Sequence, residues 1–277
     1  MVNRLFADIS KQLSVITDDS VFEARVILET AFGRDYRLKE LTGTLGEPTE
    51  RQLATVNEML ERRLSGEPLQ YIVGEWEFYG LAFKAGRGVL IPRQDTETLV
   101  DAALELLNGV PNPRVLDLCS GTGCVAAAIK NSRPDAEVTA LELYPEAYEI
   151  LCKNAGRYGI KTVQADALDE SAARAFSNLD LITANPPYLT AADMKVLQRE
   201  VSREPATALF GGDDGLDFYR KLSKVWRGSL ADGGKIAFEI GLGQEDAVAE
   251  ILRGCGYRNI ELKRDLTNRI RVVFASK

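Results

Sequence analysis

The most informative absence in this 277-residue sequence is histidine, which does not occur at all. Histidine is the usual general base near neutral pH, the partner of catalytic serine and cysteine, and a frequent zinc ligand. The sequence therefore excludes Ser-His-Asp catalysis, Cys-His catalysis and histidine-ligated zinc. Whatever chemistry this chain performs must proceed without an imidazole group.

Cysteines and long apolar runs are also scarce. The four cysteines show no metal-type pairing, so we expect neither a disulfide nor a metal site. No apolar run approaches the roughly 20 residues that span a bilayer, and the charged N-terminus is not a secretory signal. The net charge of −7 argues against tight, non-specific binding of nucleic acid. We expect a cytoplasmic protein with no membrane partner and no stable nucleic-acid partner.

The pattern of apolar residues changes twice along the chain. Residues 1–73 carry apolar residues at helical spacing and are predicted to form a small helical bundle, which we interpret as a docking domain. Residues 74–95 are rich in strand formers around Gly80, which predicts a β-hairpin linker onto which 89–91 could pair back. In residues 96–277 strands and helices alternate, which is typical of a doubly wound, mostly parallel α/β sheet.

Short apolar runs define the elements of this sheet. We expect strands at 114–118, 137–143, 161–165, 179–184, 235–240, 260–263 and 269–275. We expect helices between them at 145–158, 216–230 and 245–253, among others. The sequence thus predicts an α/β fold in which a small helical bundle precedes the sheet.

Polar residues and glycines gather where three of these strands end. The first strand ends in Asp117, and the loop Cys119-Ser120-Gly121-Thr122-Gly123 follows, whose glycines let the backbone approach a ligand closely. Glu142 ends the second strand, at the place where a carboxylate accepts both hydroxyls of a ribose. Asp166-Ala167 follows the third, where Asp166 could meet an adenine edge. Because doubly wound sheets bind ligands at the carboxyl ends of their strands, the pattern predicts an adenosine ligand.

A stiff corner, Asn185-Pro186-Pro187-Tyr188, ends the apolar run 179–184. The prolines stop both helix and strand, and proline also holds the residue before it in an extended conformation. The corner therefore presents two fixed acceptors, the side-chain oxygen of Asn185 and the carbonyl of Pro186, beside an aromatic ring. Two neighbouring acceptors suit a planar NH2 group, which has two N–H donors.

A nicotinamide-dependent dehydrogenase is an alternative at this point. Gly121-Thr122-Gly123-Cys124-Val125-Ala126 fits the dinucleotide pattern G-x-G-x-x-A. Two features oppose it. Asp117 suits an amino-acid moiety better than a pyrophosphate, and the Asn185 corner has no role in hydride transfer.

The motifs resemble those of S-adenosylmethionine-dependent amino-methyltransferases of the seven-strand class. A closer resemblance, covering nearly the whole chain, is to the release factor glutamine methyltransferases. Its matching segments are the helical N-terminal region, 77–80, 89–97, 203–205 with 208–209, and 264–265 with Arg271. Two departures are Cys119, where the family commonly has glycine, and Gln94, where proline is frequent.

This resemblance implies methyl transfer from S-adenosylmethionine, leaving S-adenosylhomocysteine, to a glutamine amide nitrogen (N5). The target would be the Gly-Gly-Gln motif of peptide-chain release factors. The resemblance implies cofactor contacts, without a metal, from Asp117, Cys119, Ser120, Gly121, Thr122, Gly123, Glu142, Asp166, Ala167 and Asn185. It assigns catalysis to Asn185, Pro186 and Tyr188, and substrate binding to the same three residues with Pro187.

Three other functions stay open on the sequence. The same chemistry could act on a glutamine of a ribosomal protein or on N6 of adenine in nucleic acid. The chain could also be a nucleotide-sensing adaptor that docks a partner through its bundle. The intact Asn185 corner argues against an adaptor, whereas the acidic charge and the 89–97 stretch argue against nucleic acid.

Overall fold

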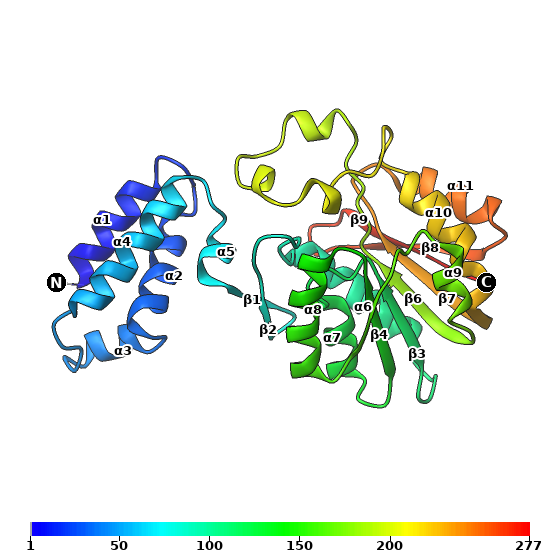
Figure 1. Cartoon of the computed structure of the whole chain (residues 1–277), viewed down its shortest axis with the longest axis horizontal. Helices are drawn as coiled ribbons and strands as arrows, with labels where there is room; N and C mark the ends of the chain where they lie inside the picture. Colours follow the sequence, from blue (N-terminus) through cyan, green and yellow to red (C-terminus); the bar gives the residue numbers. More distant parts are fainter. Residues whose placement is uncertain (1) are drawn as a thin grey trace. The chain divides into compact units, whose positions relative to one another are not determined.

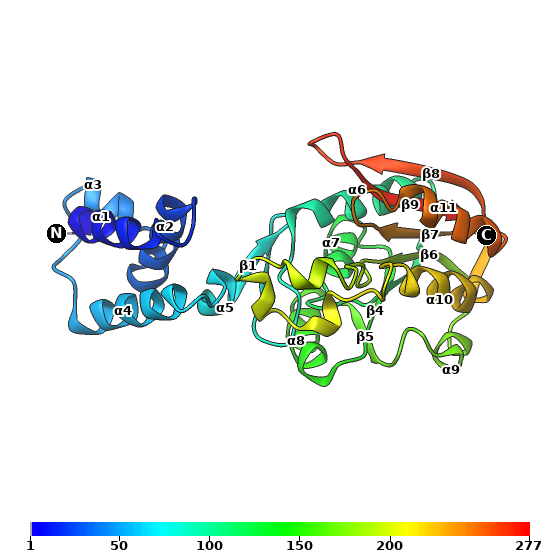
Figure 2. The ribbon, with the colours of Figure 1, turned by 90° about the horizontal axis from the view of Figure 1, so that it is seen from above.

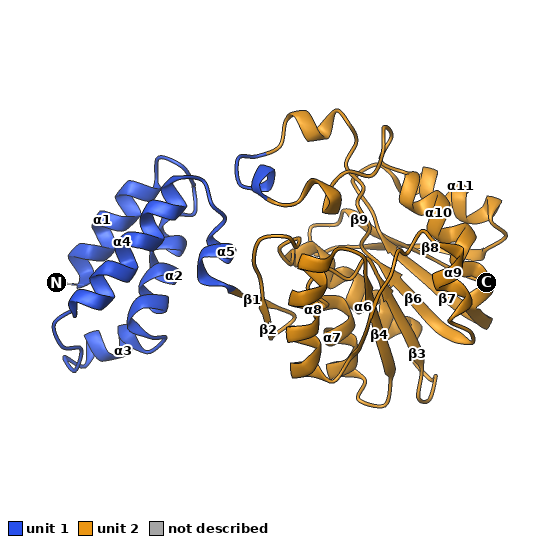
Figure 3. Cartoon of the chain, viewed as in Figure 1, with its two compact units in different colours: residues 1–74, 198–203 blue, residues 75–197, 204–277 orange. Residues whose placement is uncertain are grey.

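The computed structural model describes residues 2–277, and the chain divides into two compact units (Figure 3). One unit comprises residues 1–74 with 198–203, and the other comprises 75–197 with 204–277. No helix within residues 2–277 combines the length and the apolar character needed to cross a membrane.

The first unit is all-helical, as its apolar spacing predicts. Its helices are α1 (Val2–Leu13), α2 (Ser20–Phe32), α3 (Tyr36–Leu41), α4 (Glu50–Leu64) and α5 (Leu69–Val73). Helix α4 begins with a capping box, in which Thr49 and Gln52 each satisfy the other's backbone N–H. The buried Arg63 of α4 binds both carboxylate oxygens of Glu23 of α2, at 2.7 and 2.9 Å. This paired charge and the packed apolar stripes hold the bundle together.

The second unit opens with an antiparallel hairpin of β1 (Glu75–Phe78) and β2 (Leu81–Lys84). The expectation that residues 89–91 pair back onto it is wrong, because they form no strand. The Ile91 N–H instead donates to Oε2 of Glu204 at 2.9 Å, and Pro92 offers no N–H for a ladder. This tie holds 89–92 beside the carboxyl ends of the main sheet.

The main sheet has seven strands in the order β5-β4-β3-β6-β7-β9-β8 (Figure 1). They are β3 (Arg114–Leu118), β4 (Glu137–Glu142), β5 (Lys161–Gln164), β6 (Leu179–Ala184), β7 (Leu230–Glu239), β8 (Arg258–Arg264) and β9 (Ile270–Ser276). The strands from β5 to β7 pair in parallel, and β9 runs antiparallel to both β7 and β8. The predicted doubly wound α/β sheet is confirmed.

Helices cover both faces of this sheet (Figures 1 and 2). On one face lie α6 (Glu97–Leu106), α7 (Cys124–Ser132) and α8 (Pro145–Tyr158); on the other lie α9 (Glu170–Arg174), α10 (Asp217–Trp226) and α11 (Glu245–Gly254). Each face has its own apolar core, one around Leu99, Ile129 and Leu151, the other around Trp226 and Leu252. Burial on both faces explains why the central strands read as unbroken apolar runs.

The boundaries of some elements differ from prediction. The helix expected over 216–230 ends at Trp226, and a short 3-10 turn, Arg227–Ser229, leads directly into β7. Strand β7 therefore begins at Leu230, five residues before the predicted 235, and a register shift between Leu179 and Leu181 accommodates the extension. Gly233 and Gly234 lie in this part of β7 and hide its strand character, since glycine is a weak strand former.

Candidate active site

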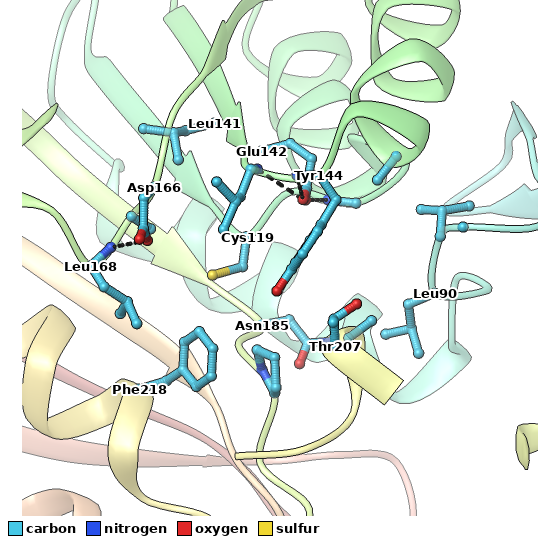
Figure 4. Close-up of a pocket in the computed structure, with 18 residues that line it drawn as sticks. Leu90, Cys119, Leu141, Glu142, Tyr144, Asp166, Leu168, Asn185, Thr207 and Phe218 are labelled. Carbon is cyan, nitrogen blue, oxygen red and sulfur yellow. Dashed lines mark hydrogen bonds between the residues drawn. The ribbon is translucent and has the colours of Figure 1, made fainter. Parts of the chain in front are cut away.

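The predicted site residues converge at the carboxyl ends of β3, β4, β5 and β6, where the strand order reverses between β3 and β6. A cavity of about 240 Å³ opens there (Figure 4). Seven of the predicted residues contribute to its wall: Cys119, Gly121, Glu142, Asp166, Ala167, Asn185 and Pro187. Leu90, Leu141, Leu168 and Phe218 supply apolar surface to it.

A smaller pocket of about 40 Å³ shares Cys119, Gly121 and Asn185 with this cavity. Asp117, Ser120 and Thr122 line the smaller pocket only. Gly123, Pro186 and Tyr188 line neither of these two pockets. Asn185 is thus the predicted catalytic residue that borders both spaces.

The loop after β3 is shaped by left-handed backbone. Gly121 and Gly123 have φ values of +54° and +78°. A Cβ at Gly123 would lie 2.5 Å from Cδ1 of the buried Leu151, so both the backbone and the packing require glycine there. Cys119 also has a positive φ, +53°, which a side chain tolerates at a cost of about 1–2 kcal/mol. A glycine at this position would avoid that cost.

Glu142 organises the same loop through its carboxylate. Oε2 accepts from the Gly121 N–H at 2.9 Å, while Oε1 accepts from the N–H groups of Leu143 and Tyr144 at 2.9 and 3.0 Å. The side chain is buried, yet it still forms part of the cavity wall. The sequence predicted a ligand-binding role for Glu142, and the structure adds a structural one.

Asp117 is held by hydroxyl groups in the smaller pocket. The Thr183 hydroxyl donates to Oδ1 at 2.7 Å, and Ser120 donates to Oδ2. Burial raises the pKa of Asp117 to about 6, although both of these hydrogen bonds act to lower it. The carboxyl groups of Asp117, Glu142 and Asp166 together favour a ligand that carries positive charge.

Asp166 and Ala167 form the wall nearest to α10. Oδ1 of the exposed Asp166 accepts from the Leu168 N–H at 2.8 Å, which shapes the turn after β5. The Ala167 carbonyl accepts from Nε1 of the fully buried Trp226 at 2.7 Å. This bond ties the cavity wall to the apolar core beneath it.

The proline corner is fixed on both sides. The carbonyl of Tyr188 accepts from Nε2 of Gln244 at 3.1 Å, and Leu189 exchanges backbone hydrogen bonds with Leu209 and Gly211. A Cβ at Gly211 would lie 2.6 Å from the Pro187 carbonyl oxygen, so glycine permits this close approach. Burial raises the pKa of Tyr188 to about 12, so its phenol stays neutral at physiological pH.

Several residues that contact the site were not predicted from the sequence. From the sequence, either Thr96 or Asp95 could cap α6. Thr96 makes no side-chain cap and instead accepts from Nδ2 of Asn185 at 3.2 Å. Charged side chains such as Arg93 and Glu97 are usually solvated. Here Arg93 donates to Glu204, and Glu97 accepts from the Tyr79 N–H. Glu239, at the end of β7, was not singled out; its one signal in the sequence is an acidic residue within an apolar strand.

Comparison with known proteins gives the family. A family model described as the PrmC N-terminal domain matches residues 4–74, and one described as the methyltransferase small domain matches residues 96–212. A release factor glutamine methyltransferase of Thermodesulfovibrio yellowstonii is 40% identical over 237 residues, which are 83% of this chain and 84% of that protein. Another, of Clostridium acetobutylicum, is 33% identical over 94% of this chain and 93% of that protein.

A solved structure supports the fold. A methyltransferase from Pyrococcus furiosus, 16% identical, matches with a TM-score of 0.51 over 80% of this chain and 98% of that one. This likeness concerns the fold alone. The relatives above show the family: this chain belongs to the release factor glutamine methyltransferase family.

Proposed function

We propose that this chain transfers a methyl group from S-adenosylmethionine to the side-chain amide nitrogen (N5) of the glutamine in the Gly-Gly-Gln motif of peptide-chain release factors. The observation that carries the proposal is the orientation of Asn185. Its NH2 group donates to Thr96, so its oxygen is the atom left to accept from a substrate. An acceptor bordering both pockets suits the NH2 group of a glutamine amide.

The residues around the cavity fit the cofactor. Apolar side chains such as Leu141 and Phe218 suit an adenine ring, and Glu142 stands where the ribose hydroxyls are expected. The Cys119–Gly123 loop, with Asp117 and Ser120, would hold the amino-acid portion in the smaller pocket. Asp166 and Ala167 would meet the adenine edge. When bound, the cofactor supplies an electrophilic methyl group on a sulfonium, whose positive charge the surrounding carboxyl groups favour.

The chain's own residues orient the target nitrogen. An amide nitrogen is a poor nucleophile because its lone pair is delocalised. If Oδ1 of Asn185 and the Pro186 carbonyl accept its two N–H groups, they favour a pyramidal nitrogen and stabilise the positive charge that develops. Tyr188, neutral with its pKa raised to about 12, packs against the amide plane and takes no proton. No base is needed before attack, which agrees with the absence of histidine.

Each of the two predicted domains, and the linker between them, has its own proposed role. We assign partner docking to the bundle of residues 1–73, linkage to the hairpin segment 74–95, and methyl transfer to residues 96–277. A translation factor as substrate supports a cytoplasmic location, and we propose neither a membrane partner nor a stable nucleic-acid partner.

Incubation with labelled S-adenosylmethionine and purified release factor tests the function. The label is expected on the glutamine of the Gly-Gly-Gln peptide and is expected to vanish when that glutamine is changed to alanine. Labelling of ribosomal protein or DNA in preference to the release factor would overturn the proposal.

The Asn185→Ala variant tests the mechanism. Removing one preorganised acceptor at a reacting centre costs about 100–1,000-fold in rate. Asn185→Asp keeps an acceptor but adds charge beside the sulfonium, so partial activity is expected. Both variants should bind cofactor nearly as the parent does. Single-turnover rates at saturating cofactor decide, and an alanine variant as fast as the parent removes Asn185 from the mechanism.

A further inference from the structure

Glu239, the last residue of β7, is a buried carboxylate that has no assigned role in the proposed methyl transfer. Only 2% of its surface is exposed, and within residues 2–277 its Oε2 accepts no hydrogen bond. A buried polar group without a partner is costly, so its presence calls for an explanation. Glu239 follows Phe238, which pairs with Ala184 of β6, so the carboxylate ends β7 next to Asn185. The side chains of Thr96 and Asn185 are close enough to lower its pKa.

The numbers of donors and acceptors in these side chains determine which group donates to which. An ionised carboxylate only accepts, whereas the Thr96 hydroxyl has a single proton to give. If Thr96 donates that proton to Glu239, its oxygen can only accept. Nδ2 of Asn185, 3.2 Å from this oxygen, is the donor that meets it. The amide of Asn185 is then held with Oδ1 free for a ligand.

We propose that Glu239 is a positioning residue for methyl transfer, which acts through the Thr96 hydroxyl to keep the Asn185 amide oxygen turned toward the substrate glutamine. This inference rests on the proposed role of Asn185 as an acceptor. The hydrogen bonds from Asn185 to Thr96 and from Thr96 to Glu239 then form a relay. Thr96 links the two ends of this relay, and the charge on Glu239 decides which way the Thr96 hydroxyl donates. An Asn185 amide turned the other way would present NH2 to the NH2 of glutamine.

The charge on Glu239 makes this relay sensitive to pH. Burial raises the pKa of Glu239 to about 7, although Thr96 and Arg271 act to lower it. A protonated Glu239 can donate to Thr96, which lets the hydroxyl donate to Asn185 and removes the preference for the productive orientation. The rate is therefore expected to fall as the pH drops through about 7.

Charged neighbours of Glu239 influence its pKa, and one of them can be removed by substitution. The charged and titratable groups facing it are Asp95, Arg271 of β9, Tyr188, Tyr219 of α10 and Cys124 of α7. Nη2 of Arg271 lies 2.5 Å from Oδ2 of Asp95, and Asp95 raises the pKa of Glu239. Removing the charge of Asp95 abolishes that effect and leaves Arg271 freer to attract Glu239. Both consequences lower the pKa.

Four variants test the relay in single-turnover methylation of the release factor at saturating cofactor, across about pH 5.5–8.5. Thr96→Val breaks the relay and is expected to slow the step about 10–100-fold with cofactor affinity unchanged, whereas Thr96→Ser restores it. Glu239→Gln removes the titrating group, so the inflection near pH 7 should disappear. Asp95→Asn should move that inflection to lower pH. Glu261→Gln, an exposed substitution on β8, is the matched control.

The outcomes separate the relay from simple packing. A purely structural role for Glu239 predicts a loss of stability while the inflection persists, and that result would overturn the proposal. So would a Thr96→Val variant as fast as the parent, or a Thr96→Ser variant as slow as Thr96→Val. If the parent itself leaves the glutamine unmethylated, the proposed function fails, a result distinct from failure of the relay. Thermal unfolding of each variant shows which of them fold.

Discussion

Replacing Glu142 with glutamine is expected to weaken the cofactor loop before it weakens any contact with a ligand. The carboxylate accepts three backbone N–H groups, one from Gly121 and two from Leu143 and Tyr144. A glutamine side chain of the same shape has one oxygen and one NH2 group. If the oxygen keeps the two bonds to Leu143 and Tyr144, the NH2 group faces the N–H of Gly121 and that bond is lost.

The structure sets the size of this effect. A hydrogen bond to a charged group contributes about 1.5–3 kcal/mol, and the Gly121 N–H is left facing another donor. The free energy of unfolding should therefore fall by about that amount in the absence of any ligand. Cofactor affinity should fall by a further factor of about 10–150, the same range converted at 1.4 kcal/mol per tenfold, because one acceptor for the ribose is lost as well.

Two measurements separate the effects. Urea denaturation of the ligand-free protein reports on the loop, and titration calorimetry with S-adenosylhomocysteine reports on the ligand contact. Glu149→Gln, an exposed change of the same chemistry on α8, should alter neither. Unchanged stability would show that Glu142 does not organise the loop, and unchanged affinity would remove it from the cofactor site.

Two further substitutions test the fold around the site and in the bundle. Gly123→Ala and Gly109→Ala share nearly the same φ, +78° and +77°, but only the first meets a core side chain. Gly123→Ala should therefore cost about 1–3 kcal/mol more in thermal unfolding, and equal losses would contradict the clash. Arg63→Ala strands the buried Glu23 and should destabilise the bundle by about 3–5 kcal/mol. Arg62→Ala, which breaks a more exposed pair, should cost less than about 1 kcal/mol; similar losses would refute the argument from burial.

Local patterns were sufficient to predict the sheet. The runs 114–118 and 179–184 are strands as predicted, because central parallel strands are buried on both faces and need apolar side chains throughout. The carboxyl ends of these two strands, Leu118 and Ala184, are also as predicted. The prediction that Glu142, Asp166 and Asn185 gather in space needed only the rule that parallel strands end at the same edge of a sheet. Their chemical roles stay predictions.

Pairs of side chains far apart in the sequence could not be predicted in the same way. Arg63 meets Glu23 across 40 positions, and Arg93 meets Glu204 across 111. A single sequence says that a charge is present but not which partner will compensate it on burial. The sequence alone therefore favours a solvated surface position for Arg93, which is the usual fate of arginine. The tertiary fold, and not any local pattern, decides such pairings.

Thr96 shows how a local rule can point to the wrong partner. Threonine before a helix is a common N-cap, and from the sequence either Thr96 or Asp95 could cap α6. In the structure the hydroxyl faces Asn185, 89 positions away, and α6 begins without a side-chain cap. A residue that gives up a favourable local role is expected at a functional site, where tertiary contacts override propensity.

The absence of histidine bears on the expected pH dependence. An enzyme that uses an acid and a base shows a bell-shaped profile set by the pKa values of both. Here the neutral Tyr188 takes no proton, and Asp117, with a pKa raised to about 6, is already bonded to two hydroxyls. Glu239 has a pKa raised to about 7, and it is buried, with only 2% of its surface exposed. The chemistry should therefore show an inflection near pH 7 that Glu239→Gln removes. This inflection reports the direction of a hydrogen-bond relay and not the removal of a proton from the substrate.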